Sequence, residues 1–129
     1  MEHAEKTILF AGAGPGDPEL LTLKGKKALE EADLVLYAGS LVNREILAFC
    51  RPCCEKADSS GLSLEEQVAL MAETAGRGKN VVRLHTGDPS LFGAVAEQKR
   101  MLEELGCSVR FIPGVSSLQA AAAAMGIQY

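Results

Sequence analysis

The stretch "TILFAGAGPGDP" (Thr7–Pro18) joins a short apolar run to a loop rich in glycine and proline. An apolar run that ends in glycine and leads into a helical pattern is typical of a buried parallel strand, a tight turn and a helix. The loop begins like a dinucleotide-binding fingerprint, but Asp17 stands where the third small residue of that fingerprint belongs.

Three features of this loop argue against a phosphate ligand. The carboxylate of Asp17 repels phosphate, and Pro15 removes a backbone N–H that would bind it. The loop also lacks the Lys-Ser/Thr pair of a P-loop, and no acid for a ribose lies between Tyr37 and Ser40. The sequence therefore predicts a ligand without phosphates, and an NAD-binding domain is the weaker alternative.

Strands and helices alternate along the chain. The predicted strands cover residues 7–12, 33–37, 54–57, 80–85 and 108–113. The predicted helices cover residues 23–32, 43–50, the segment opened by the capping box Ser63–Glu66 and ended by Gly76 and Gly78, the segment from "TGDPSLFG" to Leu105, and a last helix capped by Ser116 or Ser117. Thr22 is expected to cap the first helix, which would turn Leu23, Ala28, Leu29 and Ala32 toward the sheet.

This alternation predicts an α/β fold with a parallel sheet and right-handed crossovers. The loops "GAGPGDP", "TGDPSLFG" and "PGVSS" follow the first, fourth and fifth strands. The carboxyl edge of an open parallel sheet is where such folds bind ligands. We therefore expect these three loops to form one site, although each alone is also a good turn.

Composition limits the function classes. The 129 residues carry 13 Lys+Arg against 17 Asp+Glu, a net charge of -4, and no apolar run approaches membrane-spanning length. We expect one soluble domain after a flexible N-terminus (residues 1–6), with no nucleic-acid or membrane partner and a cytoplasmic location. No metal site is predicted: Cys50 and Cys53 have knuckle spacing but no second pair, so the four cysteines are interpreted as packed, reduced thiols.

Longer motifs identify a family. "GAGPGDPELLTLKG", "TGDPSLFG" and "PGVSS" resemble the successive motifs of the tetrapyrrole methylases, and "YAGSLVN" and "DSSGLSLEE" resemble the subgroup that methylates carbon 11 of precorrin-4 or cobalt-precorrin-4 in cobalamin biosynthesis. The resemblance covers residues 7–127. It implies a five-stranded parallel sheet of order 3-2-4-1-5 with helices on both faces, followed by a second domain that would make this chain (7–129) the N-terminal half of an enzyme. We also expect a homodimer, because a surface meant for another domain would be left bare and exposed apolar patches associate.

The resemblance also implies S-adenosylmethionine as methyl donor. The cofactor-binding residues that it implies are Pro15, Thr86, Gly87, Asp88, Leu91, Ser116 and Ser117. Asp88 has an alternative role as a helix cap before Pro89, and Asp17 is interpreted as a turn and cap residue. The alternatives are another tetrapyrrole C-methyltransferase of the pathway and a non-catalytic flavodoxin-like module.

No catalytic residue is assigned. Related uroporphyrinogen methylases have an acid at the position of Ala38, so the obvious base is missing here. His85 could titrate near neutrality but is interpreted as a structural residue at a strand end, and Tyr37 as a packing residue. The cations available for a polycarboxylate tetrapyrrole are Arg44, Arg51, Lys56 and Arg83, each of which could equally form a surface charge pair.

Overall fold

The computed structural model describes residues 6–39, 43–85 and 94–126, and its centre is one parallel sheet. The strands are β1 (Thr7–Gly12), β2 (Leu34–Tyr37), β3 (Glu55–Asp58), β4 (Val81–His85) and β5 (Ser108–Ile112). They lie in the order β3-β2-β4-β1-β5, and every neighbouring pair is parallel. The predicted fold class and strand order are confirmed.

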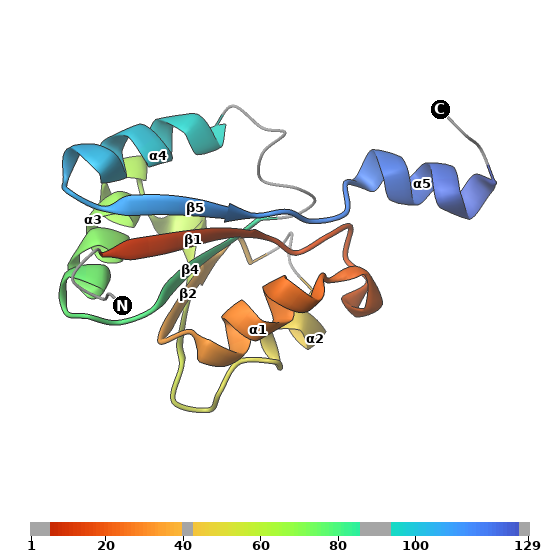
Figure 1. Cartoon of the computed structure of the whole chain (residues 1–129), viewed down its shortest axis with the longest axis horizontal. Helices are drawn as coiled ribbons and strands as arrows, with labels where there is room; N and C mark the ends of the chain where they lie inside the picture. The colour runs from red at the N-terminus through yellow and green to blue at the C-terminus, as the bar shows by residue number, and fades with distance from the viewer. Residues whose placement is uncertain (1–5, 40–42, 86–93, 127–129) are drawn as a thin grey trace.

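Helices cover both faces of this sheet (Figure 1). They are α1 (Leu23–Glu31), α2 (Arg44–Leu47), α3 (Leu64–Gly76), α4 (Ala94–Glu104) and α5 (Ser117–Met125), with short 3-10 turns η2 (Pro18–Leu20) and η3 (Ser59–Gly61). The chain runs from β1 toward the β3 edge and then back toward β5. Because crossovers are right-handed, this reversal places α1 and α2 on one face and α3 and α4 on the other.

A separate apolar core fills each face. On one side Leu29 of α1 and Ile46 of α2 pack with Val82 and Leu84 of β4, and all four side chains are almost fully buried. On the other side Val81 of β4 packs against helical residues, among them Val68, Met71, Val95 and Leu102. Neighbouring residues of β4 thus enter opposite cores, as a strand buried on both faces requires.

The predicted caps of α1 and α3 and the predicted glycine stops of α3 and α4 are confirmed. The Thr22 side chain accepts a hydrogen bond from Gly25 N at 3.0 Å, and Ser63 and Glu66 form the reciprocal capping box of α3. Gly78 and Gly106, with φ of +79° and +88°, follow the ends of α3 and α4 in the left-handed conformation that glycine adopts at little cost. Local side-chain chemistry therefore sets where these helices begin and end.

Two details of the prediction are wrong. Leu23 is 86% exposed, because the buried stripe of α1 consists of Gly25, Ala28 and Leu29, continued by Ala32 just beyond the helix. These residues have the i, i+3, i+4, i+7 spacing of one helical face, from which Leu23 points away. The predicted helix 43–50 is also shorter, since α2 ends at Leu47. Pro52 disfavours helical backbone at Arg51, and β3 starts three residues later.

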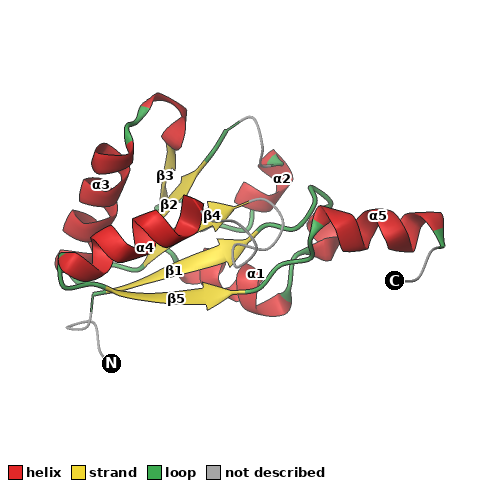
Figure 2. Ribbon diagram, turned by 90° about the horizontal axis from the view of Figure 1, so that it is seen from above, coloured by secondary structure: helices red, strands yellow, loops and turns green. Residues whose placement is uncertain are grey.

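Helix α5 extends away from the sheet in both views (Figures 1 and 2). Of its described side chains only Ala122 is buried, while Met125 is 66% exposed. Within the described residues, none of the helices has the length and hydropathy to cross a membrane.

Candidate functional site

A ligand crevice is expected between the carboxyl ends of β1 and β4. These strands are neighbours in the sheet, yet the helices that follow them, α1 and α4, lie on opposite faces (Figure 1). This is the topological switch point, where open α/β sheets bind ligands. The glycine-rich loop after β1 lies at this point of the sheet.

Glycine allows that loop to turn sharply. Gly14 and Gly16 have φ of +76° and +116°, a backbone conformation that residues other than glycine rarely adopt. A Cβ on Gly14 would also lie 3.1 Å from the carbonyl oxygen of Leu20. The loop is tied to β4, since Ala13 N donates to the carbonyl of His85, and Pro15 is exposed between the two glycines.

Asp17 caps the turn that follows. Its Oδ1 accepts a hydrogen bond from Glu19 N at 2.9 Å, as the N-cap of η2. The carboxylate thus occupies the backbone donor that a phosphate would need at this helical turn. The predicted cap role of Asp17 is confirmed, and the geometry agrees with a ligand that has no phosphate.

The loop after β5 brings Ser116 to the same edge of the sheet. Ser116 is 7% exposed and directly precedes α5, where its carbonyl accepts from Ala120 N at 3.0 Å. The structure thus places two of the predicted cofactor residues, Pro15 and Ser116, at the carboxyl edge. The remaining ones lie outside what the structure describes: Thr86, Gly87, Asp88, Leu91 and the side chain of Ser117.

A buried polar cluster lies beneath this edge, between the sheet and helices α3 and α4. Arg83 is 7% exposed and donates to the carbonyls of Leu36 and Leu84 and to Gln67 Oε1, each at 3.3 Å. Gln98 Nε2 donates to the same Oε1 at 2.9 Å. Burial lowers the pKa of Arg83 to about 10. The interpretation of Arg83 as a surface cation is wrong, and no motif in the sequence predicts that Gln98 is buried or that Gln67 contacts Arg83.

His85 belongs to the same buried region. Its ring lies 5.5 Å from that of Phe10, and its Nε2 has no hydrogen-bond partner among the described residues. Burial, with a smaller contribution from the charge of Arg83, lowers the pKa of His85 to about 4. The imidazole is therefore neutral at physiological pH. This agrees with a structural residue and corrects the expectation of titration near neutrality.

A second concave region, which we call the basic hollow, lies at the carboxyl ends of β2 and β3. It has a volume of about 560 Å³ and is lined by Tyr37, Gly39, Arg44, Leu47, Ala48, Lys56 and Asp58. Two of the four predicted substrate cations thus meet here. Arg51 lies elsewhere, because its Nη2 donates to Asp33 Oδ1 at 3.1 Å and to the carbonyl of Ala32 at 2.8 Å, at the end of α1.

Asp58 and Gly39 join the two strands that border the hollow. Asp58 Oδ1 accepts from Gly39 N at 3.0 Å, from Ser60 N at 2.9 Å and from Ser60 Oγ at 2.6 Å. These hydrogen bonds, above all those of Ser60, lower the pKa of Asp58. A Cβ on Gly39 would lie 2.1 Å from Asp58 Oδ2, so the close approach of the carboxylate requires glycine at this position.

The cysteines are all free, although they are not all packed. Cys54 and Cys107 are buried and Cys50 is partly buried, but Cys53 is exposed, contrary to prediction. Burial, with the neighbouring Cys54, raises the pKa of Cys50 to about 11, which keeps this thiol protonated and unreactive. Among residues 6–39, 43–85 and 94–126, no three His, Cys, Asp or Glu side chains gather as metal ligands would.

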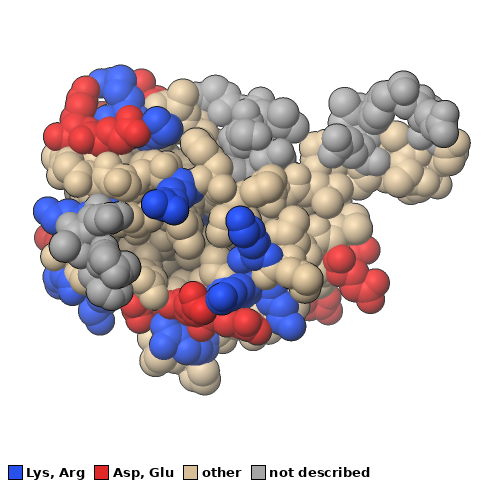
Figure 3. Space-filling model, viewed as in Figure 1, with Lys and Arg blue, Asp and Glu red and all other residues tan. Residues whose placement is uncertain are grey.

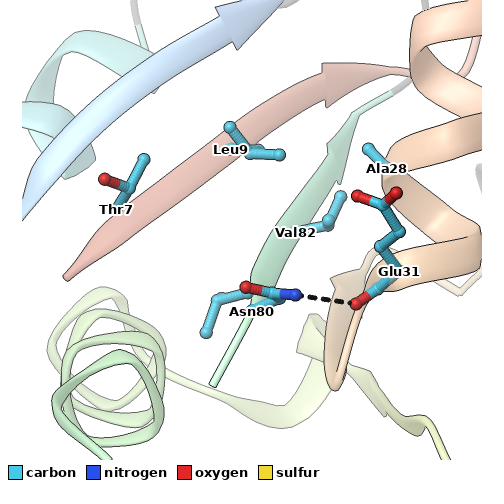
Figure 4. Close-up of a pocket in the computed structure, with 7 residues that line it drawn as sticks. Thr7, Leu9, Ala28, Glu31, Asn80 and Val82 are labelled. Atoms are coloured by element: carbon cyan, nitrogen blue, oxygen red, sulfur yellow. Dashed lines mark hydrogen bonds between the residues drawn. The ribbon is translucent and has the colours of Figure 1, made fainter. Parts of the chain in front are cut away.

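A small pocket lies at the opposite edge of the sheet (Figure 4). Its volume is about 150 Å³, and it is lined by Thr7, Leu9, Ala28, Glu31, Asn80, Val81 and Val82. The side-chain amide of Asn80 already forms a hydrogen bond within the protein, since its Nδ2 donates to the carbonyl of Glu31 at 3.0 Å. The amino ends of the strands carry none of the glycine loops, so this pocket is separate from the site.

Charges of both signs are interspersed over the face shown in Figure 3. On α4, for example, Arg100 pairs with Glu97 and Glu104, and Lys99 pairs with Glu103. Such exposed pairs contribute little to stability, typically up to about 1 kcal/mol each. This face thus shows local charge pairing.

The sequence matches the family model of the tetrapyrrole (corrin/porphyrin) methylases over residues 7–129. It is 50% identical over 123 residues to a cobalt-precorrin-4 C(11)-methyltransferase of Methanocaldococcus jannaschii, a match that covers 95% of this chain and 48% of that protein. It is 47% identical over 120 residues to a precorrin-4 C(11)-methyltransferase of Rhodococcus erythropolis, covering 93% and 48%. The chain spans about half the length of these relatives.

Solved structures of methyltransferases also match this chain. The X-ray structure of a cobalt precorrin-4 methyltransferase, a cobalamin biosynthetic enzyme, superposes with a TM-score of 0.93 at 44% identity and covers 98% of this chain and 53% of that chain. A uroporphyrin-III C-methyltransferase from Thermus thermophilus, complexed with S-adenosylhomocysteine, has a TM-score of 0.75 at 41% identity, covering 90% and 48%.

Proposed function

This chain belongs to the tetrapyrrole (corrin/porphyrin) methylases, and we propose that it is the N-terminal half of an enzyme that methylates carbon 11 of precorrin-4 or cobalt-precorrin-4 in cobalamin biosynthesis. The observation that carries the proposal is the 50% identity, over 95% of the chain, to a cobalt-precorrin-4 C(11)-methyltransferase. The glycine loop at the switch point supports it, because Pro15 and the capped Asp17 suit a ligand without phosphates.

S-adenosylmethionine is the proposed methyl donor. It carries a sulfonium, an ammonium, a carboxylate and an adenosine but no phosphate, which suits a loop that contains Pro15 and a capped Asp17. The complex of a relative with S-adenosylhomocysteine supports the same ligand. The proposed binding residues are Pro15, Thr86, Gly87, Asp88, Leu91, Ser116 and Ser117.

The proposed role of this chain in catalysis is to position the methyl donor and the acceptor. When bound, the donor supplies an electrophilic methyl group, so no nucleophile on the protein is required. The loops after β1, β4 and β5 would hold donor and acceptor in line and exclude water, which can lower a barrier by about 7–11 kcal/mol at best. We assign no base, since Ala38 lacks an ionisable group and His85 is buried.

Calorimetric titration of this chain with S-adenosylhomocysteine tests the cofactor site. We expect saturable binding that Gly87→Ala weakens at least tenfold, because the proposed role of Gly87 is to bring the backbone close to the ligand. Gly76→Ala is the matched control, since a Cβ at the end of α3 meets no atom within 4 Å. Unchanged affinity in Gly87→Ala, with thermal unfolding as in the wild type, would contradict the assignment.

We further propose a homodimer in the cytoplasm. Phe111 on the edge strand β5 is 39% exposed and Met125 on α5 is 66% exposed, and exposed apolar side chains favour association. The four free cysteines are usual for a reducing compartment. Analytical ultracentrifugation tests the assembly, and a monomer at high protein concentration would count against it.

A further inference from the structure

The basic hollow lies at the same edge of the sheet as the glycine loop but contains none of the proposed cofactor residues. Both lie at the carboxyl edge of the sheet, since Tyr37 ends β2 and Asp58 ends β3. Asn43, the residue before Arg44, donates its Nδ2 to the carbonyl of Gly16 at 2.9 Å. This hydrogen bond ties the wall of the hollow to the glycine loop. A molecule that is larger than the hollow could therefore reach the glycine loop.

The hollow contains two cations that the described protein leaves without a partner. Arg44 and Lys56 are exposed, and within residues 6–39, 43–85 and 94–126 neither forms an ion pair or side-chain hydrogen bond. Some cations of the described residues are paired, for example Arg51 with Asp33 and Lys99 with Glu103, and others such as Lys79 are unpaired on open surface. Two unpaired cations in one concavity of a chain whose net charge is -4 indicate a site for an anion.

The acid that lines the hollow forms no ion pair with either cation among the described residues. Oδ1 of Asp58 accepts hydrogen bonds from Ser60 and from Gly39 N. The hollow therefore has two cations against one carboxylate. The lining also has apolar surface, which includes Leu47, buried, and Tyr37, half-buried. An anion carried on a largely apolar body would match both the charge and this part of the lining.

We propose that Arg44 and Lys56 bind peripheral carboxylates of the tetrapyrrole acceptor, an inference that rests on the proposed function and names the contact through which this chain selects its substrate. The macrocycles of the proposed pathway derive from uroporphyrinogen and carry acidic side chains around the ring. One acid-bearing edge lies in the hollow, and the ring extends toward the glycine loop. Arg51 and Arg83 do not take part, because Arg51 is paired at the end of α1 and Arg83 is buried.

Titration of the full chain with uroporphyrin III, which carries eight carboxylates and has a strong visible absorption, tests this proposal. We expect Arg44→Gln and Lys56→Gln each to weaken binding about fivefold, and the double variant more than tenfold, as the loss of charge-assisted contacts predicts. Coproporphyrin III, with half as many carboxylates, is expected to bind more weakly and to respond less to the same substitutions.

The control is Lys79→Gln, which removes an equal charge from an exposed position beside the amino end of β4. Wild-type affinity in the double variant, an equal loss in Lys79→Gln, or no binding of uroporphyrin III by the wild type would each overturn the proposal. Calorimetry with S-adenosylhomocysteine separates this inference from the proposed function. A chain that binds the cofactor product but not the porphyrin contradicts only the assignment of Arg44 and Lys56.

Discussion

Gly39→Ala should destabilise the protein because of a single side chain, Asp58. The new Cβ would lie 2.1 Å from Asp58 Oδ2 and 2.8 Å from Cγ, whereas real Cβ contacts stay beyond 3.0 Å. The φ of Gly39 lies outside the left-handed region, so alanine is otherwise compatible with the backbone. The cost therefore comes from the collision and not from the conformation.

The size of the effect follows from what holds Asp58 in place. To relieve the contact the carboxylate must move, and its Oδ1 would then lose its hydrogen bonds to Gly39 N and to Ser60. Overpacking of this kind typically costs about 1–3 kcal/mol. In a domain of this size each 1 kcal/mol lowers the thermal midpoint by about 4 °C.

A double-mutant cycle, measured by urea unfolding and circular dichroism, distinguishes the collision with Asp58 from an effect of the backbone conformation. In an Asp58→Ala background the obstacle is gone, so Gly39→Ala should then cost less than about 0.5 kcal/mol. Gly61→Ala, where a Cβ meets nothing within 4 Å, is the control in a neighbouring turn. An equal cost of Gly39→Ala in both backgrounds would refute the reasoning.

Two further predictions concern a helix cap and a buried histidine. Thr22→Ala should lower the free energy of unfolding by about 1 kcal/mol, because Gly25 N loses its hydrogen-bond partner. The exposed Leu23 is the control, since Leu23→Ala should change this free energy by less than about 0.5 kcal/mol. Urea titrations of both variants measure the difference. His85 has a pKa of about 4 in the folded protein against 6.5 ordinarily, so the unfolded chain binds more protons between these values and stability should fall as the pH drops from 6.5 toward 4. His85→Gln should flatten this dependence, and an unchanged slope between pH 6.5 and 5 would show that the imidazole is not desolvated.

Local signals account for what the sequence predicted well. The apolar runs of β1 and β4, the cap Thr22 and the capping box at Ser63 act over a few residues, so they can be recognised without a structure. The strand order was inferred from resemblance, because pairing such as Ile8 with Val81 leaves no local pattern. The stripe of α1 was misjudged because its first member is Gly25, which a search for apolar side chains overlooks.

The site was predictable only in part, because local patterns do not show which distant segments meet. The glycine loop has a recognisable composition, and Asp17 was correctly interpreted as a cap. The separation of Arg44 and Lys56 from Arg51 and Arg83 depends on which edge and which face each residue reaches. The hydrogen bond between Gln67 and Gln98 depends on the contact between α3 and α4, and no spacing within either helix predicts it.

The position of β1 has a consequence for how the chain folds as it is synthesised. β1 is made first, but its neighbours in the sheet are β4 and β5, so Ile8 meets Val81 and Val109 only after most of the chain has appeared. Non-local pairing of this kind slows folding, and the open edges of an apolar strand can meanwhile pair with other chains. β2 and β3 can pair much earlier, since only α2 and its turns separate them. We expect nascent chains that end before β4 to depend on chaperones, and release from them to follow the synthesis of β4.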